Sequence, residues 1–299
     1  MLVNTRAFSQ EATKFVTEGV YCGDPAGSAP YYEYWAEQLK RCTEGYTVGG
    51  TRITGHHYFY LNFCRIKLTE ATEQRKAGLK TVSFPNFWDG DYQYFHALEK
   101  SAEEGKHLIV AKARRKGFSY KNAAIAANLF NTRRNSYTLL CAHDKKYLYP
   151  KGIMTMVTDY MNFLNEHTGW QKRRQVVDKI NHKRASYLQY INKQAIEKGY
   201  KSEVEAITFK DNPDAARGKD ASLVIFEECG AFDNLKASYL ATRPCVEDGG
   251  IVTGQIVLFG TGGDMEGGTI DFESMFYNPE AYDLYPFDNI WDEGSTGST

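Results

Sequence analysis

Four short apolar segments constrain most strongly how this chain can fold. They lie at 107–111, 136–142, 223–226 and 256–259, and stretches with helical periodicity separate several of them. Apolar runs of this length without polar alternation are typical of strands buried on both faces. Such strands alternating with helices form mostly parallel sheets. We therefore expect an α/β fold with a mostly parallel sheet flanked by helices, to which a further strand at 203–209 belongs.

Polar motifs follow three of these segments at the point where each strand should end. A basic loop, 112–117, comes after the first segment, the acidic pair Glu227–Glu228 after the third, and Gly260–Thr261 after the fourth. Ligands of open α/β sheets bind at the carboxyl ends of the strands. We therefore expect the three motifs to converge on one edge of the sheet and to form a site there.

The basic loop is compatible with two interpretations. Phosphate binding requires backbone N–H donors, a closely approaching backbone and a cation. Gly117 permits the close approach, and the hydroxyl of Ser119, where a helix should begin, could hold Mg²⁺. Phosphate loops commonly place lysine directly after this glycine, but Phe118 stands here. The loop is thus either a phosphate loop with a displaced lysine or a solvated basic turn on a DNA-binding face.

The two later motifs also allow a functional and a structural interpretation. Acids at the end of a buried strand can supply a metal ligand, Glu227, and a general base, Glu228, although they can also be solvated. Gly260–Thr261 either senses a phosphate and transmits its presence or forms a plain turn. Gln93, on an expected helix at 91–104, could present its amide to adenine or to solvent.

Composition excludes several classes of protein. The chain has 42% hydrophobic and 24% charged residues, as in soluble globular proteins. Its net charge is −1, so nucleic acid would have to bind at local patches. The six cysteines are scattered, which disfavours a zinc site and favours free thiols in a reducing compartment. The sequence shows neither a secretory signal nor a membrane span, so we expect an intracellular protein.

Further elements are expected from local patterns. Residues 31–40 predict a helix with an aromatic face, 57–66 an aromatic strand, and 70–80 a polar loop. The polar and basic stretch 145–198 predicts a long helical region. Its basic run 171–184 is compatible with phosphate-backbone contacts or with a solvated helix face. We also expect an Ala-rich helix from Ser119 to about Asn131, directly after the basic loop.

The order and spacing of the motifs KARRKGFS, LVIFEE and LFGTGG resemble the ATPase domain of the large subunit of tailed-phage terminases. Some members of that family carry a deviant phosphate loop, with lysine at its start and an aromatic residue after the glycine. The segment Gly55–Phe63 is also similar to an N-terminal element of many terminases. The likeness covers most of the chain from about residue 55 onward.

The resemblance implies a P-loop NTPase fold of the RecA-like class with the additional catalytic glutamate, and it implies roles for individual residues. Lys112 would be the phosphate lysine, Arg115 a catalytic arginine and Glu228 the general base. Mg²⁺ would be held by Ser119 and Glu227, and Gly260–Thr261 would couple hydrolysis to motion. The remaining nucleotide-binding positions would be Arg114, Lys116, Gly117, Phe118, Tyr120 and Gln93.

The resemblance also implies an organisation and a biological setting. We expect an N-terminal extension at 1–80, an ATPase domain at 81–290, and a flexible tail or linker at 291–299 leading to an absent nuclease domain. The activity would be ATP hydrolysis that moves double-stranded DNA into a viral procapsid, in the cytoplasm of an infected bacterium. Partners would be the portal protein, the small terminase subunit and further copies in a ring. The rival interpretations are a helicase-type ATPase and a nucleic-acid-binding module with weakened catalysis.

Overall fold

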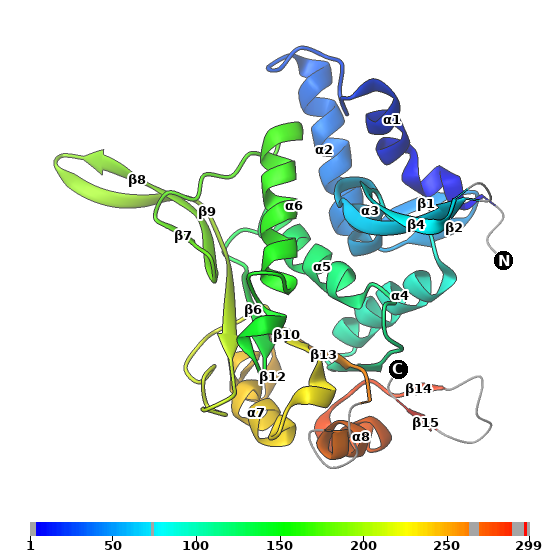
Figure 1. Ribbon diagram of the computed structural model, residues 1–299. Coiled ribbons are helices and arrows are strands. Elements are labelled where there is room, and N and C mark those ends of the chain that lie inside the picture. Colours follow the sequence, from blue (N-terminus) through cyan, green and yellow to red (C-terminus); the bar gives the residue numbers. More distant parts are fainter. Residues whose placement is uncertain (1–3, 73–74, 263–268, 289–295, 298–299) are drawn as a thin grey trace. The chain divides into compact units, whose positions relative to one another are not determined.

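A computed structural model of the chain describes residues 4–72, 75–262, 269–288 and 296–297, and its elements are shown in Figure 1. The chain forms two compact units, Met1–His96 with Thr158–Gln171 and Ala97–Val157 with Lys172–Thr299. The expected tail at 291–299 lies mostly outside the described residues. The three-part division expected from the sequence stays a prediction.

The first unit is mainly helical and contains two small antiparallel sheets. Its elements are η1 (Thr5–Ser9), α1 (Gln10–Glu18), α2 (Ala29–Glu44), β1 (Tyr46–Val48), β2 (Thr51–Ile53), α3 (Gly55–Phe63), β3 (Ile66–Thr72) and β4 (Arg75–Ser83). Helices α4 (Asp89–Glu103) and α6 (Ile153–His167) each contribute residues to both units.

The second unit contains the central sheet and the helices on its two faces. Its elements are β5 (Leu108–Ala111), α5 (Phe118–Thr132), β6 (Tyr137–Ala142), η2 (Lys145–Tyr147), β7 (Val177–Lys179), β8 (His182–Ile191), β9 (Gln194–Thr208), β10 (Leu223–Glu227), η3 (Cys229–Ala231), α7 (Leu235–Thr242), η4 (Arg243–Cys245), β11 (Glu247–Asp248), β12 (Ile251–Val252), β13 (Gln255–Gly260), α8 (Thr269–Tyr277), η5 (Pro279–Tyr282), β14 (Phe287–Asp288) and β15 (Thr296–Gly297).

The central sheet has the strand order β5-β13-β10-β6-β9-β8-β7. Every pair from β5 to β9 is parallel, whereas β8 and β7 continue the sheet in antiparallel pairing. This arrangement confirms the predicted α/β class with a mostly parallel sheet. It also brings the carboxyl ends of β5, β13 and β10 together at one edge, because parallel neighbours end on the same side.

Alternating side chains of the strands form the hydrophobic cores on the two faces. On one face, Ile109, Val224 and Leu258 belong to the core cluster that includes Phe272 of α8 and Leu235 of α7. The wholly apolar strands thus bury both sets of side chains, as continuous apolar runs predict. The side chains of β10 are buried along its full length, so the strand holds its last residue, Glu227, rigidly.

Two predictions for the first unit are wrong. The aromatic run expected as a strand at 57–66 forms helix α3 over most of its length, and the stretch expected as a loop at 70–80 pairs as strands β3 and β4. The Thr54 side chain caps α3 by accepting a hydrogen bond from the His57 backbone N–H. All nine residues of α3 are at least partly buried, and all but one are fully buried, so no polar face marks the helical period.

The prediction of a long helical region at 145–198 is also wrong. Helix α6 ends at His167, and β7, β8 and the first part of β9 follow it. A two-residue turn, Asn192–Lys193, joins β8 to β9, and both residues have positive φ, at 51° and 66°. Such turns match the twist of a hairpin. The basic run 171–184 therefore lies in a loop and two strands instead of on a helix face.

Among the described residues, no helix is both long and apolar enough to cross a membrane.

Candidate active site

The basic loop joins β5 to α5 through two residues with left-handed backbone. Arg115 has φ 64° and Gly117 has φ 73°, and Gly117 occupies the N-cap position of α5. The backbone N–H of Lys112 donates to the carbonyl of Gly260 at 2.9 Å, which ties the start of the loop to the end of β13. The loop therefore curls above the strand ends and places Ser119 in the first turn of α5.

Ser119 and Glu227 meet at the base of this loop. The Ser119 hydroxyl donates to Glu227 Oε1 at 2.7 Å, although 108 positions separate the two residues. Glu227 is 5% exposed, and burial raises the pKa of its carboxyl to about 8, with the negative charge of Glu228 acting in the same direction. The hydrogen bond from Ser119 and the positive charge of Lys112 oppose this shift.

The second oxygen of the Glu227 carboxylate, Oε2, is buried and accepts no hydrogen bond. A buried carboxylate oxygen without a partner is costly unless a cation or a proton satisfies it. Mg²⁺ prefers one or two protein oxygen ligands and completes its shell with phosphates and water. The Glu227 carboxylate and the Ser119 hydroxyl therefore fit as ligands of a magnesium ion. The described residues contain no group of three or more His, Cys, Asp or Glu suited to a metal.

Glu228 lies at the centre of a second set of contacts. Its Oε2 accepts a hydrogen bond from Lys112 Nζ at 2.9 Å, and its Oε1 accepts one from the Thr261 hydroxyl at 2.6 Å. Burial works to raise the pKa of this carboxyl, but the hydrogen bonds from Thr261 and Lys112 outweigh it and hold the pKa below its ordinary value. Glu228 is therefore a carboxylate at neutral pH, unlike its neighbour Glu227.

The backbone at the ends of β10 and β13 is fitted closely around this acid. Glu228 itself has left-handed backbone, at φ 54° and ψ 57°, which turns the chain sharply after the strand. A Cβ on Gly260 would lie only 2.7 Å from the backbone nitrogen of Cys229, so no larger residue fits there without a shift. The glycine thus lets the Gly260–Thr261 turn approach the acidic pair.

The structure brings together residues from all three sequence motifs. At the edge of the sheet, hydrogen bonds join Ser119 to Glu227, and Lys112 and Thr261 to Glu228. We call these five residues the strand-end cluster. By contrast, the side chains of Arg114, Arg115 and Lys116 are exposed on the loop.

Phe118, Tyr120 and Gln93, which were also predicted for the site, do not belong to the strand-end cluster. The Phe118 ring lies 6.2 Å from the Phe259 ring, and Tyr120 is partly buried on α5. Gln93 belongs to α4 in the first unit, and its role in adenine recognition stays a prediction.

The sequence did not indicate a role for Lys121. Its side chain is buried, and Nζ lies 4.0 Å from the centroid of the Phe118 ring, so a cation supports the aromatic residue that replaces the usual lysine. Phe118 and Lys121 are three positions apart, a spacing that places both side chains on one face of α5, so the sequence could have indicated this contact.

Comparisons with known proteins return matches among solved structures alone. No family model and no curated protein matches the chain. The large terminase of bacteriophage HK97 matches over 76% of this chain with 12% identity and a TM-score of 0.46. Two structures of the large terminase ATPase domain of Thermus phage P74-26, one of them a mutant, match over 62% and 58% with 15% identity and TM-scores of 0.43 and 0.44.

The matches cover only part of the length of the solved structures. The alignments cover 41% of the HK97 protein and 73% and 64% of the two Thermus phage chains. This chain thus spans less than half of the HK97 terminase. The fold assignment rests on the sheet itself, because the TM-scores lie below 0.5.

Proposed function

We propose that this chain is an ATP-hydrolysing motor domain of the terminase large-subunit type. One observation carries the proposal: two hydrogen-bonded sets of side chains, Ser119–Glu227 and Lys112–Glu228–Thr261, meet at the carboxyl end of a parallel sheet. They bring a cation, an ionised base and a candidate metal ligand together beneath a glycine loop. ATP hydrolysis needs this set of groups.

The two glutamates suit different tasks because their environments differ. Glu227, with its raised pKa and unpartnered oxygen, would hold Mg²⁺ together with Ser119. The ion would bind the phosphates and neutralise charge that develops on them. Glu228, with its lowered pKa, would orient a water molecule and accept its proton. A bond from the water oxygen to the γ-phosphorus would form as the bond to the β-phosphate oxygen breaks, giving ADP and phosphate.

Lys112 would change partners when ATP binds. Its ammonium lies 2.9 Å from Glu228 Oε2, so an incoming phosphate competes with this carboxylate for the same cation. Release of Glu228 from Lys112 would leave its carboxylate available for water, and Thr261 would keep the side chain oriented. The Thr261 contact also links the state of the base to the Gly260–Thr261 turn, which would pass the change on to the rest of the domain.

The coupling of hydrolysis to DNA movement rests on the resemblance of the three motifs. By that resemblance, the domain would act on double-stranded DNA in the cytoplasm of an infected bacterium. It would work with a portal protein, a small terminase subunit and further copies of itself in a ring. Arg115, exposed on the loop, would act on the phosphates as a catalytic arginine.

Turnover of ATP tests this proposal directly. We expect the wild-type chain to hydrolyse ATP in the presence of Mg²⁺ and duplex DNA. Glu228→Gln should lower the rate by about 10²- to 10⁴-fold, the usual contribution of a general base. ATP should bind at least as tightly as to the wild type, because the uncharged glutamine competes less with phosphate for Lys112. Glu280→Gln, which removes an exposed carboxylate in η5, is the matched control and should leave the rate unchanged.

Absence of turnover by the wild type, with DNA and partner proteins present, would contradict the proposal and favour a nucleic-acid-binding module without catalysis. Equal rates for Glu228→Gln and Glu280→Gln would contradict the role of Glu228.

A further inference from the structure

The root of the β8–β9 hairpin collects basic side chains on two tyrosine rings. Lys172 Nζ lies 4.6 Å and Arg134 Cζ 4.8 Å from the centroid of the Tyr200 ring. Arg173 Cζ lies 5.1 Å from the centroid of the Tyr187 ring. A cation within about 6 Å of a ring face is attracted to it. We call these five residues the ring cluster. All belong to the second unit.

A bulge in the hairpin holds Tyr200 in place. The pairing of β8 with β9 shifts register at this point, where Gly199 and Lys201 have positive φ, at 118° and 62°. The Tyr200 hydroxyl donates to the carbonyl of Thr132 at the end of α5 at 2.6 Å, and the Asn135 N–H donates to the Tyr200 carbonyl at 3.2 Å. Hydrogen bonds with the backbone therefore hold Tyr200, whose ring contacts Arg134 and Lys172, in place.

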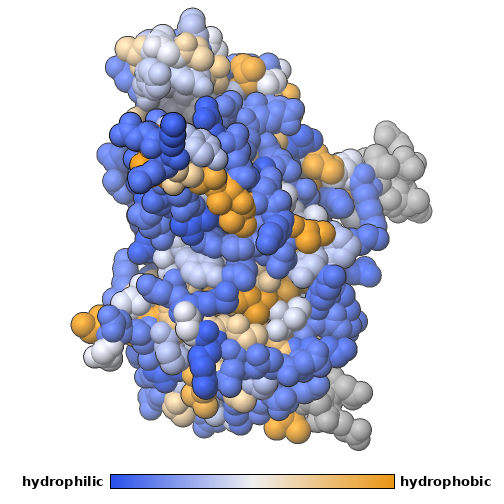
Figure 2. Space-filling model, turned by 90° about the vertical axis from the view of Figure 1, so that its left-hand side faces the viewer, coloured by the Kyte–Doolittle hydropathy of each residue, from blue (hydrophilic) through white to orange (hydrophobic). Residues whose placement is uncertain are grey.

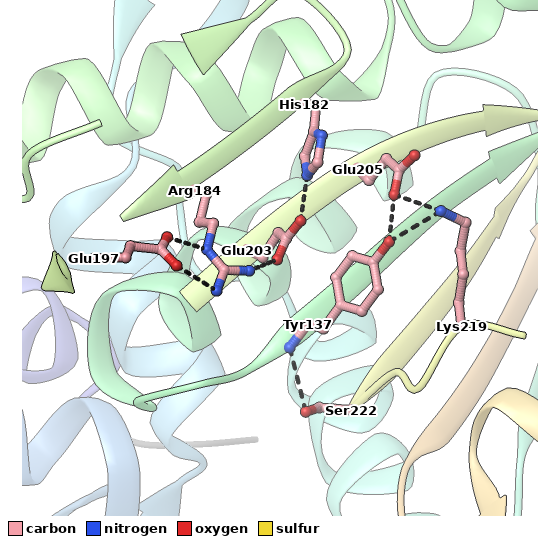
Figure 3. A network of polar contacts seen from close by, with 8 residues as sticks. All are labelled: Tyr137, His182, Arg184, Glu197, Glu203, Glu205, Lys219 and Ser222. Carbon is pink, nitrogen blue, oxygen red and sulfur yellow. Dashed lines mark hydrogen bonds and ion pairs between the residues drawn. The ribbon is translucent and has the colours of Figure 1, made fainter. Parts of the chain in front are cut away.

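Basic side chains of the neighbouring polar network are paired differently. Figure 3 shows Arg184 between Glu197 and Glu203, and Lys219 on Glu205. Within the described part of the chain, the two arginines of the ring cluster form no such ion pair. Arg184 and Lys219 are thus neutralised by carboxylates, whereas Arg134 and Arg173 lie on aromatic faces.

The crowding of positive charge in the ring cluster has a measurable consequence. Burial, together with the positive charge of Arg134, lowers the pKa of Lys172 to about 8. An anion beside the two side chains would relieve this repulsion. Since the whole chain carries a net charge of −1, attraction for a polyanion has to come from such a local collection.

The geometry favours phosphate groups over bases or apolar partners. Cations already lie over the Tyr200 and Tyr187 rings, so these rings are poorly placed to stack on bases. Figure 2 draws the side of the molecule toward which β8 and β9 point in Figure 1, and hydrophilic residues cover most of it.

We propose that the ring cluster binds the phosphodiester backbone of a nucleic-acid duplex, with Arg134 and Lys172 on one phosphate and Arg173 on another. The binding reads no sequence, since phosphate contacts position a duplex without specifying bases. That the duplex is DNA rests on the proposed function. The contact surface itself rests on the geometry of the ring cluster.

Salt-dependent binding tests the inference. The full chain, without nucleotide, is titrated with a fluorescent DNA duplex of about 30 base pairs at several salt concentrations. Each phosphate contact contributes about 0.9 to the slope of log affinity against log salt. Arg134→Ala with Lys172→Ala should reduce the slope by about 0.9, the loss of one phosphate contact, and weaken binding by roughly tenfold at low salt, equally for two unrelated sequences. Arg134→Lys with Lys172→Arg should keep the slope.

A matched control removes two cations from elsewhere in the second unit. Lys100 lies over the Tyr285 ring at 5.7 Å, on the helix before the opposite edge strand, and Lys236 pairs with Asp271. Lys100→Ala with Lys236→Ala should leave the slope unchanged.

Three results would overturn the inference: no duplex binding by the wild type, equal slopes for the ring-cluster and control variants, or equal binding of polyglutamate, which would indicate an acidic protein partner. ATP hydrolysis without DNA is measured in the same preparations. A chain that hydrolyses ATP but gives one of these three results contradicts the ring-cluster inference and leaves the proposed function standing.

Discussion

The strand-end cluster and the ring cluster both concentrate positive charge, but they balance it in different ways. In the strand-end cluster, Lys112 pairs with the carboxylate of Glu228 at 2.9 Å. In the ring cluster, Arg134 and Arg173 lie on tyrosine rings. A ring holds a cation weakly and leaves its charge available, whereas a carboxylate neutralises it.

This difference separates two uses of a cation. A paired cation can exchange one partner for another, so its binding of phosphate is coupled to the release of Glu228. Among the described residues, Arg134 and Arg173 pair with no carboxylate that they would have to give up when phosphate arrives, so their contribution is attraction alone. We therefore expect substitutions in the strand-end cluster to change chemistry and substitutions in the ring cluster to change binding.

The first test of this comparison is the effect of Lys112 on ATP affinity. Lys112→Ala should lower ATP affinity by roughly ten- to a hundredfold, the cost of losing a charge-assisted hydrogen bond of about 1.5–3 kcal/mol. Lys116→Ala, which removes an exposed cation four residues away, should change ATP affinity by less than about threefold, as surface charges do. Fluorescent-nucleotide titration measures both variants. Loss of affinity with Lys116→Ala alone would contradict the assignment of the phosphate lysine.

A smaller effect is expected on the melting temperature of the ligand-free protein as pH changes. The pKa of Glu227 is raised from 4.5 to about 8 in the folded state, so the folded chain binds a proton that the unfolded chain has released. The stability due to this proton is complete below pH 4.5 and is lost as pH rises through 8. The melting temperature of the wild type should therefore fall, relative to Glu227→Gln, between pH 5 and 9.

Mg²⁺ at pH 9 should reduce this difference, because it binds the ionised carboxylate. A melting-temperature difference that is constant with pH would contradict the protonated state of Glu227.

Much of the strand-end cluster could be predicted from the sequence, because most of its residues are placed by the strands next to them. Lys112, Glu228 and Thr261 each follow a strand directly, and parallel pairing brings these positions together. Ser119 depends instead on helix α5, which begins after the loop. The contact of Lys112 with Glu228 could not be predicted, since both residues were expected to face the substrate. Their pairing depends on how the loop curls at Arg115 and Gly117.

The ring cluster could not be predicted from the sequence for the opposite reason. Its residues come from the turn after α5, the loop before β7 and both strands of the hairpin, and the bulge at Tyr200 places them together. The polar and basic stretch looked helical because charged residues have good helix propensity. Buried residues alternate with others only briefly in β8, starting at Lys183, and the rest of the strand, toward the hairpin turn, is exposed.

A crystal structure of Glu228→Gln with ATP and Mg²⁺ would show which cation of the loop binds the phosphates. We expect Lys112 Nζ within hydrogen-bonding distance of a phosphate oxygen, with Ser119 and Glu227 beside the metal ion. A structure in which Lys112 still contacts residue 228 while Lys116 contacts the phosphates would contradict this expectation.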